Sequence, residues 1–141
     1  MKYDYDKMKK LIVELVTARG RLAELAGLQE HEFINNPHMV ASAKYHFIVA
    51  IESIIDICNH LIAKNKLRVP EDYGDTFKIL GEAGFFSVEF MDTLTAMAKF
   101  RNRLVHVYWD VDSAQLYSIL LTDLKDLDHF IELIKQELIL K

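Results

Sequence analysis

The side chains of this sequence that are best suited to chemistry lie close together near position 100. Arg101, Asn102 and His106 stand within six positions of one another. A guanidinium is a permanently charged, planar fork that matches two phosphate oxygens. An imidazole, with an unperturbed pKa of about 6.5, can accept a proton and later return it. Together these groups suit cleavage of an RNA phosphodiester, in which the 2′-hydroxyl loses a proton and the leaving 5′-oxygen gains one. This chemistry needs no metal.

Three neighbouring side chains can support this reaction. Asn102 precedes His106 by four positions, so on a helix the two are neighbours and the amide can hold the imidazole in its productive tautomer. Lys99 and Arg103 flank Arg101 and supply a local basic patch. Such a patch is required, because a chain with a formal net charge of −4 does not hold nucleic acid by general electrostatics.

The spacing of the two principal residues predicts a dimer. Successive residues of an α-helix turn by about 100°, so Arg101 and His106 diverge by about 140° and do not aim at a single point. Two copies that meet near a two-fold axis can each supply an arginine and a histidine to one cleft. The same rule places Arg101 and Tyr108 on one helical face, two turns apart. A group attached to the Tyr108 hydroxyl would then project toward the phosphate site.

The same residues also fit purely structural roles. Arginine and histidine near the C-terminal end of a helix interact favourably with its carbonyl groups and its dipole. Tyr108 equally suits a core position, because an apolar stripe precedes it. Glu52, Asp56 and His60 share a helical face and can be part of a metal site, but a charge ladder is the preferred interpretation. The sequence lacks the Glu-x-x-His motifs of a di-iron bundle, so we expect no metal and no cofactor.

Apolar residues at helical spacing, with few glycines and prolines, predict an all-α protein. The expected helices carry capping residues, namely Asn36 before a proline, Ser87, and Asp112 with Gln115. We expect a single domain over residues 1–141, an up-and-down helical bundle of four long helices plus short helices. The predicted helices cover residues 4–25, 37–64, 76–83, 88–108 and 113–138, and the connection at 28–36 holds about one helical turn.

Composition is typical of an intracellular globular chain. Hydrophobic residues make up 51% and charged residues 27% of the 141 positions, which excludes a disordered protein. The charged start has no signal-peptide core, and we expect no apolar run to cross a bilayer, so the predicted location is cytoplasmic. The single cysteine, Cys58, lies in an apolar stretch and is expected to be a buried, inert thiol.

The segment 101–106, Arg-Asn-Arg-Leu-Val-His, closely resembles the motif of the HEPN superfamily. The hallmark of that superfamily is an arginine, a polar residue, a short spacer and a histidine. With Tyr108 two positions further on, the segment is most similar to the HepT branch. Residues 110–112, the stretch 56–64 and the loop at 69–70 also resemble this branch, so the similarity spans most of the chain.

This resemblance implies a helical homodimer that cleaves RNA without a metal and acts as the toxin of a toxin–antitoxin pair. It implies Arg101 and His106 as catalytic residues, with Asn102 in support. It also implies a partner, a minimal nucleotidyltransferase antitoxin that can transfer AMP to Tyr108. If Tyr108 is not the target, Tyr117 or Tyr73 is the next candidate in this sequence. The main alternative is a non-catalytic helical binding partner of a nucleotidyltransferase or a nucleotide. A plain structural bundle is the third hypothesis.

Overall fold

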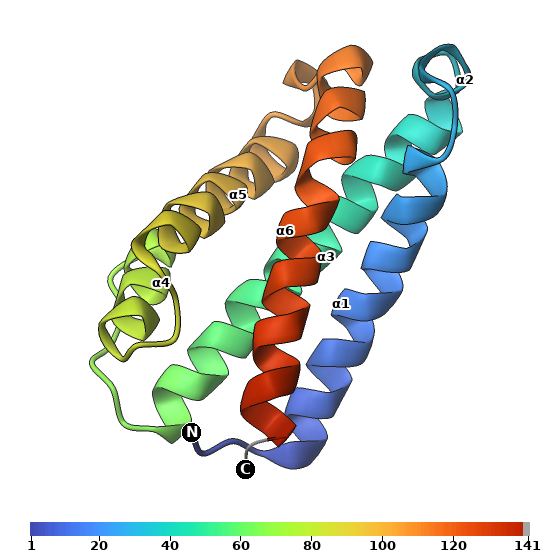
Figure 1. Ribbon diagram of the computed structural model, residues 1–141. Helices are drawn as coiled ribbons and strands as arrows, with labels where there is room; N and C mark the ends of the chain where they lie inside the picture. The colour runs from blue at the N-terminus through green and yellow to red at the C-terminus, as the bar shows by residue number, and fades with distance from the viewer. Residues whose placement is uncertain (140–141) are drawn as a thin grey trace.

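Apolar repeats run through almost the whole chain, and the computed structural model folds them into helices (Figure 1). The structure describes residues 1–139, with side chains for residues 1–138, and this part contains α-helices, one 3₁₀-helix and no strand. The all-α prediction is thereby confirmed. The elements are α1 (Tyr5–Ala26), α2 (Glu30–Ile34), α3 (Pro37–Lys64), α4 (Tyr73–Glu82), α5 (Val88–His106), the 3₁₀-helix η1 (Tyr108–Asp110) and α6 (Ser113–Ile139).

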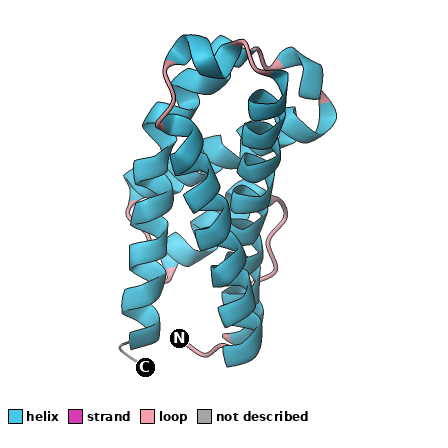
Figure 2. Cartoon of the chain, turned by 90° about the vertical axis from the view of Figure 1, so that its right-hand side faces the viewer, coloured by secondary structure: helices cyan, strands magenta, loops and turns pink. Residues whose placement is uncertain are grey.

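α3 is the central helix of the bundle, because it contacts each of the other α-helices. α1, α3 and α6 run side by side, and α5 leans against α3 with α4 packed along it (Figure 1, Figure 2). The four long helices alternate in direction along the chain, as an up-and-down bundle requires (Figure 1). α2 and η1 both lie at the end of the bundle opposite the chain termini (Figure 1).

Polar capping residues fix where the helices begin. The side chains of Asn36 and Ser87 each accept hydrogen bonds from backbone N–H groups in the first turn of the following helix, as predicted, and the Asp4 side chain, which the sequence places inside the first helix, caps α1 in the same way. α4 begins three residues earlier than predicted. The reason is Asp72, whose carboxylate accepts from the Asp75 amide at 2.7 Å and caps a turn that the apolar pattern does not reveal.

α5 ends earlier than predicted, and this changes the position of Tyr108. The sequence pattern carries the helix to Tyr108, but it ends at His106, because Val107 has φ −133° and ψ 53°, outside the helical region. Tyr108 then begins the separate 3₁₀-turn η1. The prediction that Tyr108 lies on the same face of α5 as Arg101, two turns along, is therefore wrong.

α3 also provides much of the hydrophobic core. By length and composition this helix could cross a membrane, contrary to the sequence-based expectation, but 61% of its apolar window is buried inside the fold. Burial of that kind is what a central core helix shows. Cys58 on α3 is buried, as predicted, and burial raises the pKa of its thiol, which disfavours the reactive thiolate.

Candidate active site

Arg101 is directed toward α3 and is held by two neighbours. Its Nε and Nη2 atoms donate to one carboxylate oxygen of Glu52, at 3.1 and 2.6 Å. Its Nη1 atom donates to the side-chain carbonyl of Asn102 at 2.9 Å. The Arg101 side chain keeps 16% of its surface exposed. The guanidinium is thus oriented by the protein, and a phosphate that reaches it must share it with the Glu52 carboxylate or displace that carboxylate.

The contact expected between Asn102 and His106 is not made within one chain. The Asn102 carbonyl accepts from Arg101 instead, and no hydrogen bond among the described residues joins its amide to the imidazole. Asn102 is nevertheless part of the site, because it fixes the guanidinium on one side and lines a pocket on the other.

His106 is the last residue of α5, and its side chain is exposed. Within residues 1–139 no hydrogen bond or ion pair reaches its imidazole. The structure does not bring His106 and Arg101 together in a single chain, which agrees with the angular divergence of the two positions on the helix. The imidazole is therefore available to a substrate or to a second protomer.

The basic patch predicted around Arg101 is partly neutralised. Arg103 lies 3.6 Å from an Asp110 carboxylate oxygen and donates to the side-chain carbonyl of Gln115 at 3.4 Å. Arg101 itself is paired with an acid from α3. Lys99 is exposed and makes no ion pair with a described residue. The patch thus offers one unpaired cation and two cations whose acidic partners compete with RNA.

Tyr108 lies at the surface rather than in the core. It is 40% exposed, so the alternative of a core tyrosine does not hold. The Lys44 ammonium lies 4.2 Å from the centroid of its ring and donates to the Tyr108 carbonyl at 2.8 Å. Lys44 is only 6% exposed, and burial lowers the pKa of its ammonium, although the charge of Asp112 opposes that shift. These contacts anchor η1 to α3.

The contacts with α3 also show how Tyr108 lies relative to Arg101. Lys44 holds Tyr108, Glu52 holds Arg101, and these two α3 residues are eight positions apart. With a rise of about 1.5 Å per residue, the two contacts are separated by about 12 Å along the helix. Tyr108 thus lies near the arginine site along α3. It belongs to η1 and not to α5, where the sequence pattern places it.

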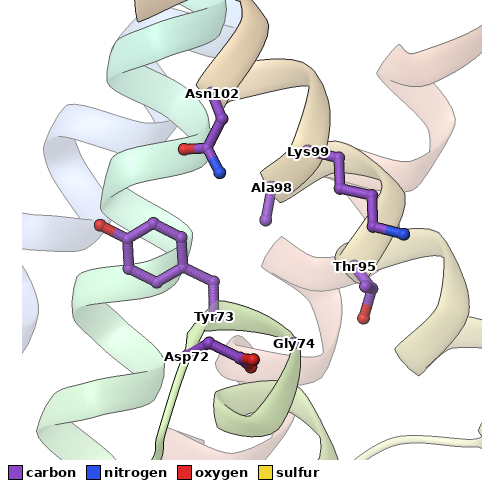
Figure 3. A pocket seen from close by; sticks show the side chains of 7 residues that line it. All are labelled: Asp72, Tyr73, Gly74, Thr95, Ala98, Lys99 and Asn102. Carbon is purple, nitrogen blue, oxygen red and sulfur yellow. The ribbon is translucent and has the colours of Figure 1, made fainter. Parts of the chain in front are cut away.

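A pocket of about 460 Å³ opens next to Arg101, between the start of α4 and the middle of α5 (Figure 3). The Arg101 guanidinium carbon lies 5.7 Å from the centroid of the Tyr73 ring, which lines this pocket. The pocket and the arginine therefore form one continuous candidate site. The lining residues are Asp72, Tyr73 and Gly74 on one side and Thr95, Ala98, Lys99 and Asn102 on the other (Figure 3).

Sequence reasoning misses three residues of this site. Lys44 is an isolated lysine between apolar positions of a helix, and that isolation is the available signal. The sequence marks Glu52 only as part of a charge ladder, and Tyr73 only as a further modification target. All three act through contacts with distant parts of the chain, which no local pattern reveals.

The charge ladder expected along α3 does not form among the described residues. Glu52 turns to Arg101, whereas His60 is buried and its Nε2 atom accepts from the Asp4 backbone amide at 2.9 Å. Burial and two neighbouring lysines lower the pKa of His60, which keeps the imidazole neutral and able to accept. No group of three or more His, Cys, Asp or Glu side chains within the described part could hold a metal ion.

Comparison with known sequences identifies a family. The profile of the family described as Ribonuclease HepT-like matches residues 15–134. A Shewanella oneidensis protein named mRNA nuclease HepT is 30% identical over 86 residues, which cover 61% of this chain and 65% of that protein. The matched stretch thus spans slightly less than two thirds of this relative.

Solved structures share the fold. A chain in a crystal structure described as a toxin–antitoxin with AMP-PNP superposes with a TM-score of 0.85 at 23% identity, covering 93% of this chain and 98% of that one. A structure of a tri-AMPylated Shewanella oneidensis HEPN toxin in complex with an MNT antitoxin gives a TM-score of 0.83, also at 23% identity, covering 92% and 96%. Because the family profile covers most of the sequence, this chain belongs to the Ribonuclease HepT-like family.

Proposed function

We propose that this protein is a metal-independent endoribonuclease, the toxin of a toxin–antitoxin pair, which works as a homodimer in the cytoplasm. The observation that carries the proposal is an exposed His106, which makes no hydrogen bond with a described residue, at the end of the helix on which Arg101 is held in a fixed orientation. The family of the chain and its relative named mRNA nuclease HepT support a nuclease activity.

In the proposed reaction, Arg101 binds the scissile phosphate and stabilises the charge that builds on its oxygens. An imidazole takes the proton of the 2′-hydroxyl, whose oxygen attacks the phosphorus. An imidazolium gives a proton to the leaving 5′-oxygen, so the products carry 2′,3′-cyclic phosphate and 5′-hydroxyl ends. A two-fold dimer supplies a His106 from each protomer for these two tasks and brings them to an arginine.

The proposal includes a partner, a minimal nucleotidyltransferase that silences the toxin by adding AMP to Tyr108. The structure described as a tri-AMPylated HEPN toxin with an MNT antitoxin supports this for a protein of the same fold. In this chain, Tyr108 is exposed on an anchored turn, so an enzyme can reach its hydroxyl. The added phosphate would compete for Arg101 and repel the RNA backbone, and the base would occupy the cleft.

RNA cleavage by the purified protein in EDTA tests this function. We expect cleavage with 2′,3′-cyclic phosphate ends, and losses of about 10²–10⁴-fold in rate for His106→Ala. Arg101→Ala should be damaged to a similar degree, and Arg101→Lys should recover only part, because lysine lacks the planar fork. His31→Ala is the matched control, since His31 is an exposed histidine on the separate helix α2.

Two results would count against the proposal. Normal cleavage by His106→Ala would remove the mechanism. A wild-type protein that binds a nucleotidyltransferase but cleaves no RNA would instead support the alternative of a non-catalytic partner.

A further inference from the structure

The pocket between α4 and α5 is placed to hold the base of a nucleotide whose phosphate lies at Arg101. Asn102 belongs to both, because its carbonyl accepts from Arg101 and its side chain lines the pocket. The Tyr73 ring also bridges them, with its centroid 5.7 Å from the guanidinium carbon. A ligand that spans the two positions therefore has an anionic part and a flat part side by side, which describes a nucleotide.

The lining of the pocket suits a nucleobase. Tyr73 offers an aromatic face on which a base can stack. The Thr95 hydroxyl donates to the Met91 carbonyl at 2.8 Å, and the methyl group of Thr95 is directed toward Gly74. With Ala98 this gives an apolar interior of about 460 Å³, within the usual range of small-molecule pockets, about 300–1,000 Å³.

On the α5 side of the pocket the polar groups at the rim favour bases that carry a carbonyl oxygen, whereas the Asp72 carboxylate on the α4 side already accepts from the Asp75 amide at 2.7 Å. The carbonyl of Asn102 is already used by Arg101, so its Nδ2 group is left to donate. The Lys99 ammonium, which has no acidic partner within the described residues, adds further donors on the same side (Figure 3). Donors of this kind match the ring carbonyls of uracil, guanine and cytosine. Adenine is the one common RNA base without a carbonyl.

We infer that this pocket is a base-binding subsite for the RNA substrate, with a preference for a carbonyl-bearing base over adenine next to the cleaved phosphate. The inference rests on the proposed RNase function, which it deepens by naming a determinant of sequence specificity. Tyr73 would be the stacking platform, and Asn102 and Lys99 would read the edge of the base.

The structure supplies a precise way to block this subsite. A Cβ atom added at Gly74 would meet the Thr95 methyl and the Asp72 carboxylate at 3.5 Å, an ordinary contact distance. Position 74 therefore accepts a Cβ atom, and the longer side chain of Gly74→Leu is chosen to fill the pocket from its floor. Gly20→Leu is the matched control, because an added Cβ there meets nothing within 4 Å and the site is on α1.

Methyl NMR of the His106→Ala protein tests the inference by measuring RNA binding without RNA cleavage. We expect a uridine hexamer to shift the Ala98 and Thr95 methyl signals and an adenosine hexamer to bind more weakly. Gly74→Leu should weaken uridine-hexamer binding by roughly tenfold, the scale of one lost stacking interaction. Tyr73→Ala should do the same through a different change, and Gly20→Leu should leave the affinity unaltered.

The outcomes separate this inference from the proposed function. Methyl shifts without any RNA cleavage by the wild type would keep the subsite and remove the RNase. Cleavage without methyl shifts, or with the same cut-site preference in Gly74→Leu as in the wild type, would overturn the subsite and keep the RNase. Equal binding of uridine 5′-monophosphate and the hexamer would assign the pocket to free nucleotides rather than to RNA, which also overturns the inference.

Discussion

We expect Glu52 to control how strongly Arg101 holds a phosphate, since the Glu52 carboxylate receives two of the guanidinium's hydrogen bonds. Glu52→Gln keeps an acceptor oxygen at this position but removes the negative charge. We expect the substitution to tighten binding of single-stranded RNA several-fold in a His106→Ala background, measured by fluorescence polarisation. The dependence on salt should steepen, by a slope of up to about 0.7 for one added phosphate contact.

A second carboxylate provides the control for that measurement. Asp56 lies one turn further along α3 and is exposed, and Asp56→Asn removes the same charge without releasing the guanidinium. We expect Asp56→Asn to change the affinity for RNA less than Glu52→Gln does. Weaker RNA binding in Glu52→Gln would mean that the carboxylate is needed to orient Arg101, and that its competition with phosphate is unimportant.

In the proposed function Tyr108 serves regulation, and proton transfer is assigned to His106. Tyr108→Phe should keep a large share of the RNase activity and lose its sensitivity to a cognate nucleotidyltransferase with ATP. Intact-mass measurement should show AMP-sized additions to the wild type and none to the mutant. Tyr45→Phe is the control, since Tyr45 is an even more exposed tyrosine, at 61%, on α3.

The structure also ranks the remaining tyrosine targets. Tyr117 uses its hydroxyl to donate to the Leu28 carbonyl at 2.7 Å, whereas Tyr73 is 37% exposed beside Arg101. If Tyr108→Phe is still modified and silenced, Tyr73 is the next residue to test. If Tyr108→Phe instead abolishes cleavage, the tyrosine contributes to the reaction directly.

The sequence could indicate these residues but not their partners. Spacing alone places Arg101, Asn102 and His106 on one helix, because helical geometry is local. The carboxylate that pairs with Arg101 is 49 positions away, and the lysine that anchors Tyr108 is 64 positions away. Such contacts depend on how α3 and α5 pack, so the expected bond from Asn102 to His106 is replaced by one that only the folded chain reveals.

At the scale of helices and turns, the sequence predicted those helix boundaries that are set by hydrogen bonds between residues close together in the chain. The starts of α3 and α5 followed from the capping residues Asn36 and Ser87, whose hydrogen bonds reach only two or three residues along the chain. The end of α5 did not follow, because no glycine or proline marks Val107. The break is stabilised instead by a tertiary contact, the donation from Lys44 to the Tyr108 carbonyl.

The contact between Lys44 and Tyr108 leads to a prediction with opposite effects on the rigidity of η1 and on the free energy of unfolding of the whole protein. Lys44→Met keeps an unbranched side chain one heavy atom shorter than lysine and removes a buried charge, so the free energy of unfolding at pH 7 should rise by about 1 kcal/mol. The same change frees η1, and amide exchange at Asp110, whose N–H donates to the Val107 carbonyl at 2.8 Å, should become faster. Urea denaturation and hydrogen exchange measure the two effects.

The pH dependence of Lys44→Met provides its internal check. Burial lowers the pKa of Lys44 below its ordinary value of 10.5, so on raising the pH the folded protein loses this proton before the unfolded chain does. Between the lowered pKa and 10.5 the unfolded state binds more protons, and the stability of the wild type rises with pH relative to the mutant. The advantage of methionine should therefore shrink toward pH 10. A constant difference would mean that burial does not perturb Lys44.

At the scale of the whole molecule, the bundle follows from the apolar pattern, but the arrangement around α3 does not. A broad apolar face on residues 37–64 predicts a buried helix, and its contacts with every other α-helix make it the scaffold of the site. The pocket escaped prediction because its two sides belong to α4 and α5 and become neighbours only by packing. The surface that would join two copies in the proposed homodimer depends on the folded shape of both chains, which no sequence pattern describes.

The proposed dimer is therefore the property with the most direct consequence for activity. Among the described residues of one chain, no hydrogen bond reaches the His106 imidazole and Arg101 turns to α3, so the proposed site needs groups from both protomers. Arg101→Ala and His106→Ala should each be inactive alone. Light scattering should give the mass of a dimer at micromolar concentration for the wild type and for both variants.

Mixing the two inactive variants tests whether the site is shared between protomers. When subunits exchange, half of the dimers become mixed, and each mixed dimer holds one Arg101 and one His106 on different protomers. Mixed dimers should cleave RNA faster than the His106→Ala dimer, which has no imidazole at the site, but far more slowly than the wild type, because the proposed reaction uses two imidazoles and losing one costs about 10²–10⁴-fold. Cleavage by mixed dimers of confirmed composition that is no faster than that of His106→Ala would place Arg101 and His106 of each site in the same protomer. It would also require α5 to change shape when RNA binds.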